Sequence, residues 1–342
     1  MSMIRTAIIG YGRSGRFLHG AGLKGNAESF NVVAVASASQ ESRDKAGEDF
    51  SCPTYANYRK MLTEHTLHLV VIVSRNDQHC EMACEALRAG ANVLVTKPIG
   101  INKGEVEKMF QVAAESGKKI FPYFPARWGT DFNRIKDIVD AGEIGSVFAV
   151  RRSFYGFATR DDWQTRVDAG GGIILNWATH LIDPAMQVAG GKVKAVFGTC
   201  SRVLNPGDAE DQFYSVLLMD NGVRVHSEWT FSPKSLQNWF VQGTKGCIIA
   251  SGRELEIHAG EPSKPADPTV VGDMSGDGQL EVRTELVGED VFGDPVVIYA
   301  DVARDLNGEA IFPVGGEEAV LMSAVMDAVK QSQRELRMIN LT

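Results

Sequence analysis

The chain has 342 residues, 44% hydrophobic and 23% charged, a balance typical of globular proteins and a length that suits about two domains. Its net charge is −8, and no basic stripe or polybasic helix predicts binding to nucleic acid or to a membrane surface. No apolar run approaches the ~18 residues of a membrane span, and the N-terminus runs directly into a predicted strand. The five cysteines are few and odd in number, which favours reduced thiols in a cytoplasmic protein.

A glycine-rich motif follows the apolar run 4–9 and precedes a predicted helix over 14–24: Gly10-Tyr11-Gly12-Arg13-Ser14-Gly15. Between a strand and a helix, the pattern G-x-G-x-x-G predicts a dinucleotide-binding turn. The first glycine permits the tight turn, the second lets the backbone approach a pyrophosphate, and the third lets the helix pack closely. The helix N-terminus offers unpaired N–H groups to the phosphates. We therefore expect all six residues to belong to a cofactor site.

The next predicted strand, 31–36, ends in small hydroxyl residues. An acidic residue that binds the ribose of NAD often follows this strand, but here the first carboxylate is Glu41. Ser37, Ser39 and Arg43 suit a 2′-phosphate instead, which favours NADP over NAD. Alternatively, Arg43 is a solvated residue of the following helix.

The first half continues as alternating strands and helices, which predicts a doubly wound parallel sheet. Strands are expected over 67–73, 92–95 and 119–124, and helices over 57–64, from about 77 to 89 with Asn76 or Asp77 as N-cap, and over 102–117 with Asn102 as N-cap. Cys80 and Cys84 lie one turn apart, but without further ligands nearby they predict free thiols and no metal site.

Lys97 is a candidate for the chemistry. It lies between a predicted buried strand and Pro98, so it is extended and projects at the carboxyl edge of the sheet. Ligands bind at this edge in open parallel sheets, and a lysine there can polarise an oxygen. The alternative is a surface lysine at a turn.

The composition changes after residue 124, and short alternating runs predict a second, open and mainly antiparallel sheet. The runs are 147–154, 193–200, 213–219, 223–231, 239–242 and 247–250, with a hairpin at Asn221-Gly222, helices over 130–141 and 317–331, and a loop over 262–278. We expect an α/β protein with a dinucleotide-binding Rossmann domain over 1–124 and an α+β domain for substrate binding and oligomerisation over 125–342.

Residues 168–183 contain the second chemical motif. Glycines at 170–172 predict a turn, and a helix follows in which Asn176 and His180 are four residues apart and share a face, with Asp183 one turn beyond. A histidine there suits a general acid–base, because its pKa lies near neutral pH. The alternative is a hydrogen-bonded histidine of the core.

Together these stretches resemble the Gfo/Idh/MocA oxidoreductases, over nearly the whole chain. The matching features are the glycine-rich turn with His19, the spacing of Asn76 and His79, the motif Thr96-Lys97-Pro98, and the glycine turn followed by His180. The resemblance implies a homodimer or homotetramer formed through the C-terminal sheet. It also implies that further residues approach the cofactor: Ser74, Arg75, Asn76, His79, Thr96, Lys97 and Arg127.

Three residues depart from the family pattern. Thr96 replaces a glutamate, Arg75 replaces a proline, and Asn176 replaces an aspartate one turn before the histidine. Asparagine exchanges hydrogen bonds but takes no proton at neutral pH. A proton relay through position 176 is therefore excluded, and the acid–base role falls to His180.

The resemblance implies hydride transfer between a nicotinamide and a hydroxyl-bearing carbon of a sugar, inositol or related polyol. We expect His180 to remove the hydroxyl proton in oxidation, Lys97 to donate to the same oxygen and lower the pKa of His180, and Asn176 to orient the substrate. The residues expected to contact substrate are Lys97, Arg127, Tyr155, Trp163, Arg166, Asn176 and His180.

Two other functions stay open. One is a glycosidase or lyase of the same fold that uses a tightly held NAD transiently. The other is a catalytically silent ligand sensor, which Thr96 and Asn176 make conceivable.

Overall fold

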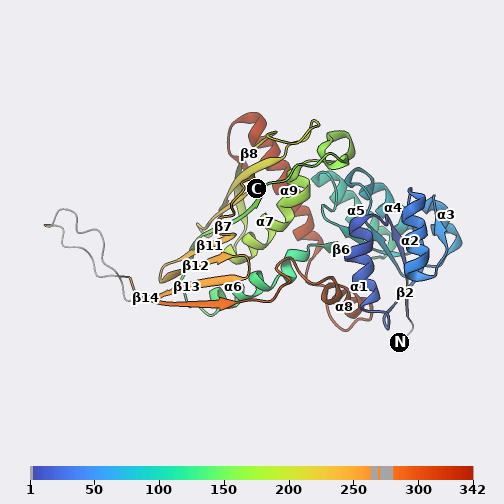
Figure 1. Cartoon of the computed structure of the whole chain (residues 1–342), viewed down its shortest axis with the longest axis horizontal. Coiled ribbons are helices and arrows are strands. Elements are labelled where there is room, and N and C mark those ends of the chain that lie inside the picture. The colour runs from blue at the N-terminus through green and yellow to red at the C-terminus, as the bar shows by residue number, and fades with distance from the viewer. Residues whose placement is uncertain (1–2, 263–268, 270–279, 342) are drawn as a thin grey trace.

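The computed structural model describes residues 3–262, 269 and 280–341, and in this part of the chain no helix is both long and apolar enough to cross a membrane. Two sheets lie side by side along the longest axis of the molecule, as Figure 1 shows, with the N-terminal sheet at one end and strands β12 to β14 toward the other.

The N-terminal sheet is wholly parallel, with the strand order β3-β2-β1-β4-β5-β6, and confirms the predicted doubly wound fold. Its strands are β1 (Ile4–Ile9), β2 (Phe30–Ala36), β3 (Thr54–Tyr55), β4 (Leu69–Ile72), β5 (Asn92–Thr96) and β6 (Ile120–Tyr123). Its α-helices are α1 (Ala21–Lys24), α2 (Gln40–Phe50), α3 (Tyr58–Glu64), α4 (His79–Arg88) and α5 (Lys103–Ser116). All four residues of β4 are buried, as expected for a strand covered on both faces.

Of two helix N-caps predicted in this half, one is confirmed and one is wrong. Asn102 caps α5 as expected, because its Oδ1 accepts a hydrogen bond from the Glu105 amide at 2.9 Å. The prediction that Asn76 or Asp77 caps α4 is wrong. A 3₁₀ turn, η2 (Asn76–Gln78), precedes α4, and Asn76 uses its amide to donate to the Gly170 carbonyl oxygen at 2.7 Å instead.

The second sheet has nine strands in the order β14-β13-β12-β11-β7-β10-β9-β8-β15 and is antiparallel except for the parallel pair β7–β10. The strands are β7 (Val147–Gly156), β8 (Val193–Ser201), β9 (Gln212–Met219), β10 (Arg224–Phe231), β11 (Trp239–Gly243), β12 (Gly246–Ser251), β13 (Glu254–Gly260), β14 (Leu280–Leu286) and β15 (Ile339–Asn340). Strands β13, β14 and β15 were not predicted from the sequence. The loop expected over 262–278 falls almost entirely outside the described residues.

Helices α6 (Thr130–Asp140), α7 (Ile173–Ala189) and α9 (Gly316–Glu335) accompany this sheet. α7 packs on β7 and β10, and α9 packs on β8, so one face of the sheet is covered by helices. The alternating burial along β9 follows from this, because Phe213, Ser215 and Leu217 point to the helices and their neighbours point to the other face.

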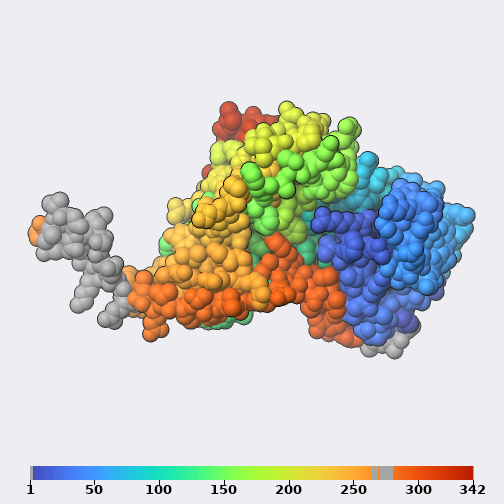
Figure 2. All heavy atoms as spheres, viewed as in Figure 1, coloured from blue at the N-terminus to red at the C-terminus, as the bar shows by residue number. Residues whose placement is uncertain are grey.

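Helix α8 (Pro295–Leu306) was not expected from the sequence, although Asp294 followed by Pro295 is a recognisable N-terminal signal. It packs against α1 in the N-terminal half: the Asn26 amide donates to the Val296 carbonyl oxygen at 2.9 Å, and a Cβ on Gly22 would meet the Tyr299 ring at 2.4 Å. Figure 2 shows this orange-red segment pressed against the blue N-terminal part. The division after residue 124 stays a prediction.

A buried ion-pair cluster joins three elements between the sheets. Arg127 lies on the 3₁₀ turn η3 (Pro125–Trp128) and donates to both carboxylate oxygens of Asp183 on α7, at 2.8 and 2.7 Å. Its Nη1 also donates to Glu318 on α9 at 2.7 Å. Arg127 and Asp183 are 9% and 1% exposed in their side chains, so each needs the other to offset the cost of burial.

We predict that Arg127→Met lowers the free energy of unfolding by about 3–5 kcal/mol, because it leaves Asp183 buried and unpaired. Urea unfolding followed by circular dichroism measures this. Arg88→Met, at an exposed position on α4, is the matched control and should change stability by less than about 0.5 kcal/mol. Wild-type stability together with lost nucleotide affinity in Arg127→Met would instead support the expected contact of Arg127 with the cofactor.

Candidate active site

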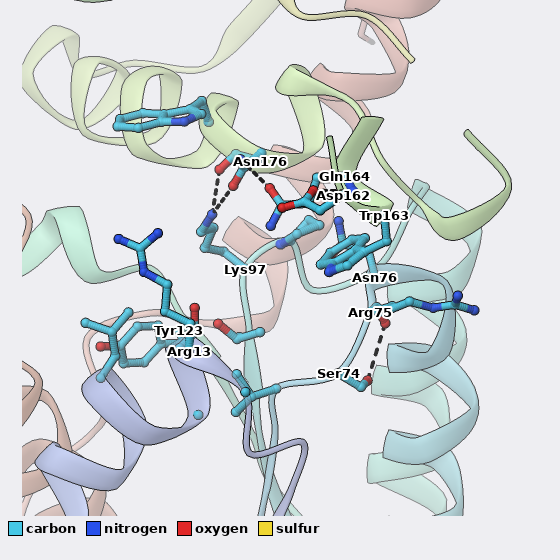
Figure 3. Close-up of a pocket in the computed structure, with 18 of the residues that line it drawn as sticks. Arg13, Ser74, Arg75, Asn76, Lys97, Tyr123, Asp162, Trp163, Gln164 and Asn176 are labelled. Atoms are coloured by element: carbon cyan, nitrogen blue, oxygen red, sulfur yellow. Dashed lines mark hydrogen bonds between the residues drawn. The ribbon is translucent and has the colours of Figure 1, made fainter. Parts of the chain in front are cut away.

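A cavity of about 720 Å³ lies between the carboxyl edge of the parallel sheet and helix α7. Figure 3 shows Lys97 rising from the sheet edge toward Asn176 on α7, with Arg13 and Arg75 on the N-terminal side and Asp162, Trp163 and Gln164 on the other. The lining comprises Gly12, Arg13, Ser14, Gly15, Phe17, Leu18, Val73, Ser74, Arg75, Asn76, Thr96, Lys97, Pro98, Tyr123, Pro125, Arg160, Asp162, Trp163, Gln164, Asn176, Trp177 and His180.

The glycine-rich turn forms one end of this cavity. A Cβ on Gly10, where φ is +96°, would lie 2.3 Å from the Val73 carbonyl oxygen, and a Cβ on Gly15 would lie 2.3 Å from the Gly10 carbonyl oxygen. Both positions therefore require glycine for a tight turn. A Cβ on Gly12 would meet nothing within 4 Å, so the backbone there is open to the cavity. This geometry fits a dinucleotide whose pyrophosphate approaches Gly12, Arg13 and Ser14.

The helix predicted over 14–24 is present. Most of it is a π-helix, η1 (Gly15–Gly20), which continues as α1. Tyr11 differs from the expectation: its side chain is 2% exposed, and its hydroxyl donates to Asp49 at 2.9 Å, away from the cavity. Only its backbone is left to contact a cofactor.

The turn after β2 carries the residues expected near the ribose. It lies beside the glycine-rich turn, because the Gly10 amide donates to the Ala36 carbonyl oxygen at 2.8 Å. The Arg43 guanidinium folds back over this turn and donates to the carbonyl oxygens of Ser37 and Ala38 at 2.7 and 2.8 Å. Ser39 caps α2, with its hydroxyl 3.4 Å from the Ser42 amide.

Lys97 spans the space between the two halves of the chain. Its Nζ donates to the backbone carbonyl oxygen of Asn176 at 2.6 Å and to the Asn176 side-chain oxygen at 2.8 Å. Burial, and then the positive charge of Arg160, lower the pKa of Lys97 to about 7. Both the ammonium and the neutral amine are therefore available near neutral pH.

His180 lies one turn beyond Asn176 on α7, and its ring packs against Trp177 and Phe292, with centroids 5.4 and 5.6 Å away. Its Nδ1 is buried and has no hydrogen-bond partner among the described residues, whereas the ring also lines the cavity. Burial, followed by the charges of Lys97 and Arg152, holds the pKa of His180 well below its ordinary value. The expectation that Lys97 lowers this pKa agrees with the electrostatics, although burial is the larger cause.

The segment between β7 and α7 supplies residues that the sequence did not single out. The Gln164 side-chain oxygen accepts from the Asn176 amide at 2.6 Å and so fixes which way that amide points. Arg160 pairs with Asp162 at 2.7 Å, and its Nε is buried without a partner in the described part of the chain. Polar residues beside the predicted Trp163 were the available signal, but nothing in their spacing distinguishes them from a solvated loop.

Hydrogen bonds of His79 connect the loop after β4 with the loop after β5. His79 is buried, with Nδ1 2.8 Å from the Pro98 carbonyl oxygen and Nε2 3.1 Å from the Ser74 carbonyl oxygen, so it links the two loops behind the cavity rather than lining it. Thr96 lines the cavity and shares a hydrogen bond of 3.2 Å with Nε2 of His19. Burial lowers the pKa of His19 to about 3, so this ring is neutral.

Three of the expected substrate residues lie away from this cavity lining. Arg127 is held by Asp183 and Glu318. The Tyr155 hydroxyl donates to Glu228 at 3.1 Å, and Arg166 is largely exposed and pairs with Asp168. The expected residues Lys97, Trp163, Asn176 and His180 do line the cavity, together with Arg13, Ser14, Ser74, Arg75, Asn76 and Thr96. Roles for all of them stay predictions.

Comparison with known proteins agrees with this architecture. Residues 4–124 match the oxidoreductase family with an NAD-binding Rossmann fold, and residues 132–249 match the GFO/IDH/MocA C-terminal domain. The chain is 27% identical to the uncharacterized oxidoreductase YdgJ of Escherichia coli, over 95% of this chain and 94% of that one. It is 24% identical to the scyllo-inositol 2-dehydrogenase (NADP(+)) IolW of Bacillus subtilis, over 99% and 96%.

Among solved structures, the WlbA dehydrogenase of Bordetella pertussis in complex with NADH and UDP-GlcNAcA superposes with a TM-score of 0.83 at 19% identity, covering 100% of this chain and 99% of that one. At this identity the likeness concerns the fold. Together with the two matched domains, it leads to one conclusion: the chain belongs to the Gfo/Idh/MocA family of NAD-binding oxidoreductases.

Proposed function

We propose that the protein transfers a hydride between a nicotinamide cofactor and a hydroxyl-bearing carbon of a sugar, inositol or related polyol. One observation carries the proposal: Lys97 and His180, from opposite halves of the chain, line the same cavity as the glycine-rich turn. The relatives support the substrate class, because IolW is named for scyllo-inositol and the WlbA structure contains a nucleotide sugar.

When bound, the nicotinamide supplies or accepts the hydride. The chain's own residues then have to hold the reacting oxygen and exchange its proton. Lys97 and His180 are the two cavity residues suited to both tasks, and Asn176 fixes Lys97 through two hydrogen bonds. Trp163 and Trp177 add aromatic surface that suits the C–H face of a sugar ring.

We predict cofactor turnover in a screen of sugars, inositols and their keto forms, followed by nicotinamide absorbance. His180→Ala should lower the rate by a factor of ~10²–10⁴, the usual effect of losing a group that exchanges a proton with substrate. His65→Ala, which removes a ring that shares a hydrogen bond with the Tyr55 hydroxyl and does not line the cavity, is the matched control and should keep the wild-type rate.

The same screen distinguishes this oxidoreductase from the two alternative functions, a glycosidase or lyase and a ligand sensor. Cleavage of a glycoside without net change in the cofactor would contradict the proposal and favour a glycosidase or lyase. Tight cofactor binding without turnover on any compound, with a partner protein that co-purifies, would favour a ligand sensor.

The cofactor is proposed to be NADP rather than NAD. No carboxylate directly follows β2, and Arg43 lies over the turn formed by residues 37–39. Its guanidinium donates to the carbonyl oxygens of Ser37 and Ala38 and to the Gln40 side-chain oxygen, and the N–H groups that these bonds leave over can meet a 2′-phosphate. The name of IolW, which specifies NADP(+), agrees with this choice.

We predict that the wild-type protein binds NADPH more tightly than NADH in fluorescence titrations. Arg43→Ala should weaken NADPH binding roughly tenfold, ~1.4 kcal/mol, and leave NADH binding unchanged, because only NADPH carries the 2′-phosphate. Arg59→Ala, which removes a guanidinium paired with Glu81 and Glu85 on the protein surface, is the control. Equal or tighter binding of NADH by the wild type would overturn the choice.

Assembly through the C-terminal sheet is also proposed, as a homodimer or homotetramer. Paired strands place a row of side chains across the face opposite the helices: Phe197, Val216, His226, Arg151, Phe240 and Ile249. A broad face with this many large apolar side chains is typical of an interface between subunits.

We predict that Phe240→Glu shifts the assembly to monomers in sedimentation velocity, because it buries a charge at the centre of this face. Ile311→Glu, at a position 91% exposed and away from the sheet, should leave the mass unchanged. A monomeric wild-type protein at micromolar concentration would contradict the proposed interface.

A further inference from the structure

The charged side chains that line the cavity are mostly of one sign. Among the described residues of this lining, four are lysine or arginine, namely Arg13, Arg75, Lys97 and Arg160, whereas Asp162 is the one carboxylate. A cleft with a surplus of one sign of charge attracts ligands of the opposite sign and raises their local concentration. The lining therefore favours negative charge on the molecules that occupy the cavity.

The proposed cofactor accounts for only part of this surplus. Arg13 belongs to the glycine-rich turn, which the pyrophosphate would approach, and the proposed 2′-phosphate would lie at the turn after β2. Arg75 is paired with Asp77, with 3.0 Å between its Nη2 and the carboxylate. Lys97 and Arg160 are the two cations that neither the cofactor phosphates nor this pair explains.

Arg160 lies beside the part of α7 that binds Lys97. Arg160, Gln164 and Asn176 line a second, much smaller cavity as well as the large one. The Asn176 side chain is hydrogen-bonded to Gln164 at 2.6 Å and to Lys97 at 2.8 Å. Figure 3 shows Asp162 and Gln164 next to Asn176, at the tip of Lys97. Both cations therefore lie at the end of the cavity where the reacting oxygen is proposed to bind.

The Arg160 guanidinium keeps donors that the protein does not use. Its Nη2 donates to Asp162 at 2.7 Å, and no other carboxylate of the described residues lies within ion-pair distance. Nη1 makes no hydrogen bond within the described part of the chain, and the side chain is 37% exposed. A guanidinium has five N–H donors in a planar fork that fits a carboxylate. Arg160 can therefore bind a carboxylate of a ligand while it stays paired with Asp162.

Asp162 holds Arg160 in place. Its Oδ1 accepts from the Gln164 amide at 2.9 Å, as the N-cap of the 3₁₀ turn η4 (Trp163–Thr165), while its Oδ2 accepts from Arg160. The backbone amide of Arg160 in turn donates to the Asn205 side chain at 2.9 Å. Both ends of the arginine are thus fixed before a ligand binds, which lowers the entropy cost of binding.

The three departures from the family pattern all change the charge of this cavity in the same direction. Thr96 stands in place of a glutamate, Asn176 in place of an aspartate and Arg75 in place of a proline, and all three line the cavity. Two negative charges are lost and one positive charge is gained. A carboxylate beside Lys97 would repel an anionic ligand, whereas a threonine and an asparagine do not. The cavity of this chain is therefore better suited to an anion than the family pattern would make it.

We propose that the substrate is a sugar acid whose carboxylate binds to Arg160 while its hydroxyl-bearing carbon faces the nicotinamide. The reaction in this statement rests on the proposed function, but the binding of the carboxylate does not require hydride transfer. A carboxylate fits better than a phosphate monoester. Arg160 already shares its charge with Asp162, and burial, followed by the charge of Arg160, lowers the pKa of Lys97 to about 7. The remaining surplus matches one negative charge better than the nearly two of a phosphate.

Calorimetric titration tests the proposal without turnover, on protein loaded with the redox form of the cofactor that does not react with the added compound. Glucuronate and galacturonate are each compared with their uncharged amides, and glucose 6-phosphate is added as a phosphate. We expect at least one sugar acid to bind ~10-fold or more tightly than its amide, the usual effect of a charge-assisted hydrogen bond. In Arg160→Gln this preference should disappear, while the amide binds as it does to the wild type. Arg253→Gln, at an exposed arginine paired with Glu289, should keep the preference.

Amides that bind as tightly as the acids, no binding by either acid, or an unchanged preference in folded Arg160→Gln would each overturn the proposal, and so would tighter binding of glucose 6-phosphate. The wild-type comparison of acid with amide decides the matter even if Arg160→Gln does not fold. The outcomes are separate from those of the substrate screen. Turnover of polyols by a protein that prefers the amides would refute this inference alone, whereas binding of a sugar acid through Arg160 without turnover of any compound would refute the proposed function alone.

Discussion

The two hydrogen bonds from Lys97 to Asn176 connect two parts of the chain that fold around separate sheets. Lys97 leaves the carboxyl edge of the parallel sheet, and Asn176 lies in the first turns of α7, which rests on the nine-stranded sheet. The cavity exists because these elements face each other across that contact. The buried ion pairs of Arg127 with Asp183 and Glu318 hold η3, α7 and α9 in the corresponding arrangement nearby.

This arrangement places an amine where burial disfavours its charge. The pKa of Lys97 is about 7 in the folded chain, against its ordinary value of 10.5. Between these values the unfolded chain binds more protons than the folded one, so folding is opposed at neutral pH and opposed less as the pH rises toward 10.5. A fold that retains such a lysine, with the charge of Arg160 acting on it, gives up stability for a set of polarising groups, as is common at functional sites.

The sequence predicted the features that depend on local pattern. The glycine-rich turn, the parallel strands and the position of Lys97 before Pro98 follow from spacing and backbone preference, and the structure has them at the edge of one cavity. Features that depend on distant packing escaped prediction. The sequence does not distinguish Arg127 from Arg152. In the structure Arg127 is paired with Asp183 and Glu318, whereas Arg152 is buried against the Trp239 ring, with Asp131 3.8 Å away. Helix α8 was also missed, although its start is signalled by Asp294 and Pro295.

The asparagine at position 176, where the family pattern has an acidic residue, affects the pKa of Lys97. A carboxylate at this position, within hydrogen-bond distance of Nζ, would favour the ammonium and raise the pKa of Lys97. The amide oxygen accepts the same hydrogen bond without a negative charge, and Gln164 fixes the amide in the orientation that presents this oxygen. The asparagine that removes a proton relay from α7 thereby leaves Lys97 able to release its proton near neutral pH. The uncharged side chain at position 176 and the lowered pKa of Lys97 are then two aspects of one electrostatic arrangement.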